Sequence, residues 1–257
     1  MNTSLCKISI ITPSYNQGQF IEATILSVLN QTYPNIEYIV VDGGSTDGTM
    51  AVVDRYRDRI DVVIHERDKG QSDAINKGFR LATGELVGWI NSDDVLYPDC
   101  VARMVQYYHR NADGAVYYGS VLDRIDSEGK RIMTYSVPIP DRHYLLNYNY
   151  DIIQPGSFYP TQLVQRVGYL NERIHYCMDL DLWLRLLTHG PIYSYADEPV
   201  AGFRIWGESK TSTGGQWFLS DIIHVLKQHG ASAYARTLFK AQYQKIRKQV
   251  KAKLISA

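Results

Sequence analysis

Two adjacent carboxylates, Asp93 and Asp94, follow an apolar run of strand-forming residues at 86–90 and precede Pro98, a residue typical of helix starts. In open α/β sheets, the carboxyl ends of buried strands face the crevice that binds ligands. Neighbouring carboxylates repel each other in a partly desolvated cleft unless a cation or a shared proton compensates. The stretch therefore predicts a hard divalent metal at a strand end. A polar turn that caps the next helix is an equally good interpretation of this stretch alone.

Two other loops end strands that we expect at the same edge. The first follows an apolar run at 36–41 and contains Asp42 and three glycines, which let a ligand approach the backbone while Asp42 accepts hydrogen bonds from a base or ribose. The second contains Tyr15, which is placed to stack on a base. A capped turn and a tyrosine packed on its neighbours are the alternatives. The glycine pattern is neither a Walker loop nor a G-x-G-x-x-G fingerprint.

Alternating strands and helices are predicted to position these loops. The strands are expected at 8–12, 36–41, 62–64 and 86–90, and the helices at 19–29, 49–56 and 73–81. This order predicts an α/β fold with a mostly parallel sheet and right-handed crossovers. Beyond residue 110 we expect a hairpin (115–125 with 130–137), a binding loop (141–154), helices at 163–167 and 179–187, and a strand at 192–196.

Composition limits the compartment and the partners. The 257 residues suffice for one large domain, and 27 basic and 27 acidic residues give no net charge, so no nucleic-acid partner is implied. Three widely spaced cysteines do not form a disulfide or zinc framework and fit a reducing compartment. The N-terminal apolar stretch is too short and too polar for a signal peptide or membrane span. These features predict a cytoplasmic protein.

The tail differs from the body in charge. No acidic residue follows Asp221, so residues 222–257 carry a formal charge of +8 and residues 1–221 carry −8. Apolar residues recur every three or four positions between 239 and 254, with basic residues on other faces. Such a helix, over 236–254, can lie on the anionic inner face of a membrane. It can equally pack on its own domain or on a second subunit in a homo-oligomer.

Five segments resemble, in order, the family 2 glycosyltransferases of the GT-A fold. They are ISIITPSYN at 8–16, SVLNQTYPNIEYIVVDGGSTDGT at 27–49, DKGQSDAINKGFRLATGE at 68–85, WINSDDVLYP at 89–98 and VGYLNERIHYCMDLDLWLRL at 167–186. The similarity covers roughly residues 7 to 211. It implies a GT-A-like, Rossmann-like domain at 1–215, with a parallel sheet flanked by helices, followed by a basic amphipathic helical extension at 216–257.

The resemblance also implies a donor site. Asp42 matches the acid that contacts the base, while Gly43 stands where the family has a second acid. The family's D-x-D motif falls on Asn91-Ser92-Asp93, which leaves Asp93, followed by Asp94, as ligands for Mn²⁺ or Mg²⁺ and makes Asn91 a ribose or sugar contact. The implied donor-binding residues are Thr12, Pro13, Tyr15, Asp42, Gly44, Ser45, Asp73, Asn91, Ser92, Asp93, Arg204 and Lys210.

Catalysis is assigned by the same resemblance. Asp179 matches the catalytic base at the start of a helix, with Met178 in place of the preceding Glu, whereas an N-cap is the alternative role. Asp181 and Gln154 are implied on the acceptor side. Trp206 stands where a metal-binding His often lies. Arg204 and Lys210 are candidate phosphate contacts, with solvated surface charges as the alternative.

Together these features predict an inverting glycosyltransferase. It would move a sugar from a nucleoside-diphosphate donor, with UDP favoured, to a hydroxyl of a glycan or lipid-linked acceptor. A catalytically impaired nucleotide-sugar-binding module is the alternative, because Gly43, Asn91, Met178 and Trp206 depart from the family pattern. A nucleotidyltransferase also places carboxylates at strand ends, but the Asp179 helix disfavours it.

Overall fold

A parallel sheet forms the centre of the computed structural model, which describes residues 5–195 and 197–255. Its strands are β1 (Ile8–Ser14), β2 (Ile36–Asp42), β3 (Val62–His65), β4 (Leu86–Trp89) and β9 (Tyr159–Pro160), in the order β3-β2-β1-β4-β9. The first four run parallel, and β9 pairs antiparallel with β4. The predicted mostly parallel α/β sheet is confirmed.

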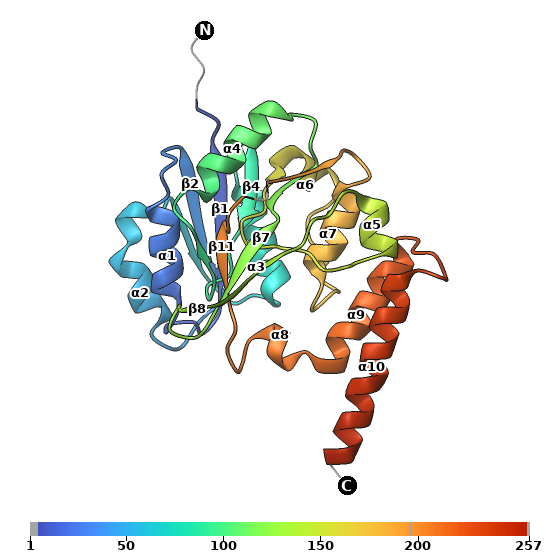
Figure 1. The fold of residues 1–257 in the computed structure, drawn as a ribbon. Coiled ribbons are helices and arrows are strands. Elements are labelled where there is room, and N and C mark those ends of the chain that lie inside the picture. The colour runs from blue at the N-terminus through green and yellow to red at the C-terminus, as the bar shows by residue number, and fades with distance from the viewer. Residues whose placement is uncertain (1–4, 196, 256–257) are drawn as a thin grey trace.

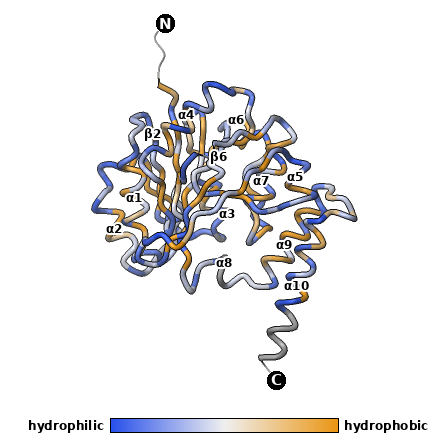
Figure 2. Tube along the Cα trace, in the orientation of Figure 1, coloured by the Kyte–Doolittle hydropathy of each residue, from blue (hydrophilic) through white to orange (hydrophobic). Residues whose placement is uncertain are grey.

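Helices cover the sheet, as the sequence predicts. They are α1 (Ile21–Leu29), α2 (Thr49–Arg55), a 3₁₀ turn (Arg57–Arg59), α3 (Gln71–Leu81) and α4 (Cys100–Arg110). Helix α3 packs closely on β1 at Gly78, where a Cβ would lie 2.6 Å from the Ile11 side chain. Figure 2 shows hydrophobic residues along the central strands, and every residue of β1 and β4 is buried. Burial on both faces explains their continuous apolar runs.

The second half adds smaller sheets, which the sequence predicts only in part. It contains β5 (Val95–Leu96), β6 (Val116–Gly119), β7 (Val121–Ile125), β8 (Arg131–Ser136), α5 (Arg142–Asn147), α6 (Thr161–Arg166), α7 (Met178–Leu186), β10 (Ile192–Tyr195) and β11 (Ala201–Arg204). The β7–β8 hairpin is confirmed. The strand expected at 115–125 is two strands in different sheets, and the expected loop at 141–154 contains α5. Ala196, the expected end of β10, lies outside the described residues.

The C-terminal segment forms α8 (Lys210–Thr213), α9 (Gly215–Gln228) and α10 (Arg236–Ile255). Helices α9 and α10 lie side by side, and α10 extends beyond the body on the side of α8 (Figure 1). Asp221 of α9 accepts hydrogen bonds from the backbone of His175 and Tyr176, before α7. The helical extension is thus packed on the body, and the boundary at 215/216 stays a prediction. Among the described helices, none is long and apolar enough to cross a membrane.

Candidate active site

The carboxyl ends of β1, β2 and β4 lie at one edge of the sheet, as predicted. Ser14 pairs with Asp42 at the ends of β1 and β2, and Gly43 N–H donates to the Ser14 carbonyl. Ile90, just after β4, donates to the carbonyl of Ile11 on β1. The three predicted ligand loops therefore leave the sheet beside one another.

The Asp42 carboxylate shapes its own loop. It is completely buried and accepts hydrogen bonds from the backbone N–H groups of Gly44 and Ser45 and from the Ser45 hydroxyl. The His65 ring nitrogen Nδ1 lies 2.7 Å from Asp42 Oδ2. Gly44 has φ = +84°, a backbone conformation that glycine adopts without strain. These contacts hold the glycine-rich backbone open at the edge of the sheet.

The end of β1 and the loop that follows it expose only some of the side chains predicted to contact the donor. Tyr15 is 60% exposed, so its ring is available to a ligand. Pro13 is buried, and the fully buried Thr12 hydroxyl lies 3.1 Å from the Tyr38 hydroxyl. The Thr12 side chain therefore faces the core, because Tyr38 on the neighbouring strand offers it a partner there. A donor contact through this side chain is therefore not supported, and the predicted role of Thr12 stays a prediction.

Asp68 occupies the space that a side chain at position 43 would need. A Cβ built on Gly43 would lie 2.2 Å from Asp68 Oδ2. Asp68 Oδ1 accepts a hydrogen bond from Gly70 N–H, which fixes the carboxylate in that place. The acid that the family places at position 43 is thus replaced in space by an acid 25 residues later. Asp68 is not among the site residues predicted from the sequence, although it lies within the 68–85 segment that resembles the family.

Asp73 also shapes a turn. Its Oδ2 accepts a hydrogen bond from the Lys69 backbone at the start of α3, and the Lys77 ammonium lies 3.8 Å away. Its predicted contact with the donor stays a prediction.

Asn91, two residues after β4, lies in a network of amide side chains. Its Oδ1 accepts a hydrogen bond from Gln71 Nε2 at 2.8 Å, and its Nδ2 donates to Asp94 Oδ2 at 3.2 Å and to Gln154 Oε1 at 3.5 Å. The buried Gln154 donates in turn to the Trp89 carbonyl. Gln154 therefore helps to position Asn91, and its acceptor-side role stays a prediction that these contacts do not support.

Gln71 is a second residue that the sequence did not single out. Its Oε1 is buried and has no hydrogen-bond partner among the described residues. Because Gln71 holds Asn91 and begins α3, it links the 68–71 turn to the end of β4.

Asp93 and Asp94 have different environments. Asp93 is partly exposed, and its Oδ2 accepts a hydrogen bond from the Trp206 indole N–H at 2.9 Å. Burial raises the pKa of Asp93. Asp94 is fully buried and accepts hydrogen bonds from the Arg204 backbone N–H and from Asn91, and burial together with the Asp93 charge raises its pKa well above the usual range. Asp94 thus acts as a hydrogen-bond acceptor within the fold, and its predicted role as a metal ligand stays a prediction that these contacts do not support. Ser92, between them, is also buried.

Arg204 points into the body. Its Nε donates to the Asp93 carbonyl, its Nη1 donates to the carbonyls of Asp126 and Ser127, and its guanidinium lies over the Phe20 ring. Only 3% of Arg204 is exposed. These carbonyl groups occupy its Nε and Nη1, so the contacts give no support to its predicted role as a phosphate contact, which stays a prediction.

The described residues offer a metal only part of a coordination shell. They contain no group of three or more His, Cys, Asp and Glu residues that could hold an ion. An indole N–H donates only, so Trp206 cannot replace a histidine ligand. Asp93 nonetheless supplies a carboxylate in a partly buried place with no cation within hydrogen-bonding distance of its side chain among the described residues. Mg²⁺ sites that use one carboxylate are completed by substrate phosphates and water. Asp93 fits an ion of this kind.

Asp179 lies in the first turn of α7, on the same side as the strand ends. It is partly exposed, and its Oδ1 accepts a hydrogen bond from Leu180 N–H. Burial raises the pKa of Asp179 to about 6, against the opposing effects of this hydrogen bond and of the Lys210 charge. Lys210 donates to the His175 carbonyl, and burial lowers its pKa. A carboxylate with this pKa is ionised at neutral pH and basic enough to accept a proton.

The segment that connects β11 to α8 contacts Asp93 at one end and residues near Asp179 at the other. Trp206 contacts Asp93 at the end of β4, and Lys210 contacts the residues before Asp179. This segment thus links the end of β4 to the residues before α7, whereas Arg204, which precedes both contacts, is turned inward.

Asp181 faces away from this edge. Its Oδ2 accepts from Arg185 Nε and Nη2 at 2.9 and 2.7 Å, and its Oδ1 lies 2.8 Å from His229 Nε2. Burial alone would raise the pKa of Asp181, but these partners lower it. Both oxygens are engaged, so Asp181 joins α9 to α7, and its acceptor-side role stays a prediction that these contacts do not support.

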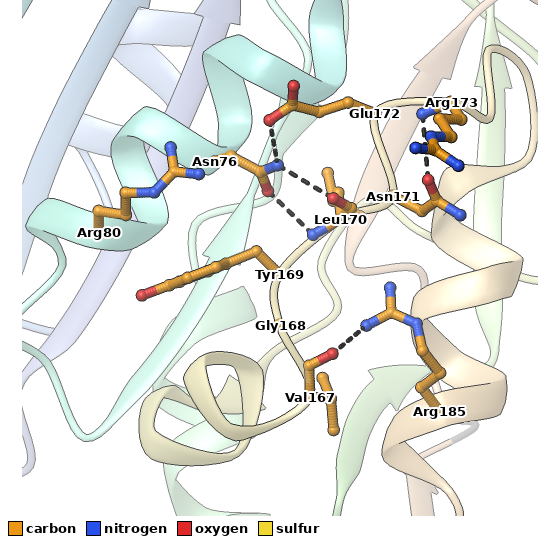
Figure 3. A pocket seen from close by; sticks show the side chains of 10 residues that line it. All are labelled: Asn76, Arg80, Val167, Gly168, Tyr169, Leu170, Asn171, Glu172, Arg173 and Arg185. Carbon is orange, nitrogen blue, oxygen red and sulfur yellow. Dashed lines mark hydrogen bonds between the residues drawn. The ribbon is translucent and has the colours of Figure 1, made fainter.

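Asn76 fixes the segment that leads into α7 (Figure 3). Its side-chain amide bonds both backbone groups of Leu170 and donates to Glu172. A hollow of about 470 Å³ lies beside it, with Arg80, Tyr169 and Arg185 in its lining. None of the predicted site residues lines this hollow, so it is distinct from the edge described above.

Solved structures with the GT-A fold resemble this arrangement. S. aureus TarS 1–349 in complex with UDP-GlcNAc has a TM-score of 0.69 and 17% sequence identity, over 95% of this chain and 73% of that one. The mannosyltransferase PcManGT from Pyrobaculum calidifontis in complex with GDP-Man and Mn²⁺ has a TM-score of 0.70 and 16% identity, over 96% and 74%. These similarities show the GT-A fold of this chain.

The sequence comparisons identify the family. The model for glycosyl transferase family 2 matches residues 9–173. An uncharacterised glycosyltransferase of Rickettsia prowazekii is 31% identical over 217 residues, which is 80% of this chain and 66% of the relative. The chain belongs to glycosyltransferase family 2. It spans slightly less than two thirds of the length of that relative.

Proposed function

We propose that this chain transfers a sugar from a nucleoside-diphosphate donor to a hydroxyl of a glycan or lipid-linked acceptor, with inversion at the anomeric carbon. The observation that carries the proposal is Asp179, a partly buried carboxylate with a pKa of about 6 beside the edge where the donor loops end. A UDP-sugar is the favoured donor, since TarS has been solved with UDP-GlcNAc, and a GDP-sugar is the alternative from PcManGT.

Asp179 would act as the general base. Inverting transfer needs a group that removes the proton from the acceptor hydroxyl as its oxygen attacks the face opposite the leaving diphosphate. At neutral pH, the carboxylate is ionised, and protonation would leave it neutral as the product forms. The positive charge of Lys210 lowers the pKa of Asp179 and so partly offsets the effect of burial, which favours the ionised carboxylate at neutral pH.

The donor would lie on the loops that end β1, β2 and β4. Tyr15 is exposed for stacking on the base, and the Gly44 and Ser45 backbone is held by Asp42. Asp68 supplies the negative charge that the family carries at position 43. Asn91 is held by Gln71 and Gln154 and would meet the ribose or the sugar.

The leaving diphosphate needs its charge neutralised. Asp93 would hold Mn²⁺ or Mg²⁺ together with the donor's phosphates, and such an ion stabilises negative charge on a leaving diphosphate. Lys210 is the remaining candidate for a direct phosphate contact. We also propose that the enzyme acts in a reducing, cytoplasmic compartment, because Cys6, Cys100 and Cys177 are free and buried.

A thermal-shift screen tests this proposal. The protein is measured against UDP, GDP and dTDP and their sugars, each with and without Mn²⁺ or Mg²⁺. A ligand that binds only the folded state raises the unfolding midpoint by mass action, so one nucleotide series is expected to stand out and to gain from the metal. No shift with any nucleotide would refute the proposal. Binding without release of nucleoside diphosphate in the presence of acceptors would favour the catalytically impaired module.

A further inference from the structure

Helix α10 presents an apolar stripe to solvent. Phe239, Tyr243 and Ile246 are 57%, 67% and 60% exposed. Residues spaced by four and three positions lie on one face of a helix, so the three side chains form a continuous row. Tyr234, just before α10, is 87% exposed. Single exposed apolar residues are common, but an ordered row on one helix is a feature of interaction surfaces.

The opposite side of α10 is fixed to the body. Leu238 and Ala241 are buried, and the Thr237 hydroxyl donates to the Leu146 carbonyl of α5. Lys240 bonds the Asp151 carboxylate at 2.9 Å, and its ammonium lies over the Tyr150 ring. Because these contacts set the rotation of the helix, they direct the apolar row outward.

Basic residues accompany the row. Arg236 and Arg247 lie within about a quarter turn of the row, are exposed and form no ion pair with any residue in the described part of the chain. No acidic residue follows Asp221, so nothing on α10 can neutralise them. Figure 2 shows hydrophilic and hydrophobic residues alternating along the described length of α10. The predicted segment 236–254 continues through 249–254, whose side chains lie outside the described part.

The charge pattern distinguishes the candidate occupants. A second copy would bring one acid-free, basic helix against another, and like charges across an interface oppose association. Nucleic acid would satisfy the charges but would leave the aliphatic Ile246 in contact with water or phosphate. An anionic lipid surface satisfies both features, because basic side chains meet the headgroups while the apolar row enters the acyl boundary.

We infer that α10 docks on an anionic lipid surface through Phe239, Tyr243 and Ile246, with Arg236 and Arg247 on the headgroups. This surface is separate from the donor loops, so the inference goes beyond the proposed transfer reaction and does not depend on the donor. The helix extends past the body on the side of α8 (Figure 1), and docking would therefore hold the adjoining α8 side of the enzyme close to the membrane.

Vesicle flotation with the full chain tests the inference. Vesicles of phosphatidylcholine alone are compared with vesicles that contain about one third phosphatidylglycerol, and binding to the anionic vesicles is expected to be at least about tenfold tighter. Raising NaCl from about 0.05 to about 0.5 M is expected to weaken this binding, because salt screens the headgroup charge. The triple variant Phe239→Ser, Tyr243→Ser, Ile246→Ser is expected to lose it.

A matched control uses two apolar side chains elsewhere. Ile132 and Met133 on β8 are 57% and 45% exposed, and Ile132→Ser with Met133→Ser is expected to bind like the wild type. All variants change exposed residues, so their thermal midpoints and donor binding should be unchanged, which keeps this test separate from the proposed function. Equal binding to neutral vesicles, no binding, or retained binding by the triple variant would overturn the inference. The inference would also be overturned if the wild type formed a dimer or bound nucleic acid instead of vesicles, and if the triple variant lost that association.

Discussion

Replacing Asp179 with Asn should remove activity and increase stability at the same time. The ordinary Asp pKa is 3.8, and in the fold the pKa of Asp179 is raised to about 6 because burial disfavours the charged carboxylate. A group of this kind stabilises the fold most below pH 4, and that stability is lost as the pH rises through 6. Asn is nearly isosteric, stays neutral and can still accept the Leu180 hydrogen bond.

The pKa difference sets the magnitude. The variant should exceed the wild type in free energy of unfolding by about 3 kcal/mol at pH 8 and by roughly half as much at pH 5, taking 1.36 kcal/mol per pKa unit. Urea unfolding at the two pH values measures both differences. The control is Asp58→Asn, which changes an exposed carboxylate and should give no such pattern. A variant that is less stable than the wild type at pH 8, or a difference that does not shrink at pH 5, would refute the reasoning.

Three further predictions concern the surrounding residues. Asp181→Asn should lower the free energy of unfolding by about 3–5 kcal/mol, because Arg185 and His229 lose a buried charged partner. Urea unfolding measures this change, and a decrease of less than about 1 kcal/mol would contradict the structural role of Asp181. Gly43→Asp should weaken donor binding by about tenfold or more, since its Cβ would lie 2.2 Å from Asp68 Oδ2. Calorimetry should show recovery when Asp68→Gly is added, and equal losses in the single and double variants would argue against the exchange of acids. Asp93→Asn should abolish the gain in donor affinity that Mn²⁺ provides, and a metal effect that persists in this variant would exclude Asp93 as the ligand.

The strand ends and the loops could be predicted from the sequence. Apolar runs such as 36–41 and 86–90 have the length and composition of buried parallel strands, and the polar residues that follow them must leave the sheet at one edge. This logic is enough to place Asp42, Asn91 and Asp93 at the same edge of the sheet, and the structure agrees.

Side-chain orientation was harder to predict, because it depends on partners far away in sequence. Thr12 turns to Tyr38, Gln154 turns to Trp89, and Arg204 donates to the carbonyls of two loops. Each is polar and close to the site, and the sequence does not show which side its partner occupies. The pairing of Gly43 with Asp68 likewise depends on the adjacent ends of β2 and β3.

The different orientations of Asp179 and Asp181 had a signal in the sequence. Asp179 and Asp181 are two residues apart, and on a helix such residues do not share a face. Only one of them can face the crevice if the helix packs on the body. In the structure, Asp179 is partly exposed and Asp181 is buried.

The most direct test of the account compares donor binding and sugar transfer in the same preparations of wild type, Asp179→Asn and Asp58→Asn. We expect unchanged donor binding in all three and a loss of about 10²–10⁴-fold in transfer only in Asp179→Asn, the range for removal of a general base. The wild-type kcat/KM should rise with pH through about 6, where Asp179 ionises. Transfer by Asp179→Asn at the wild-type rate would contradict the central claim.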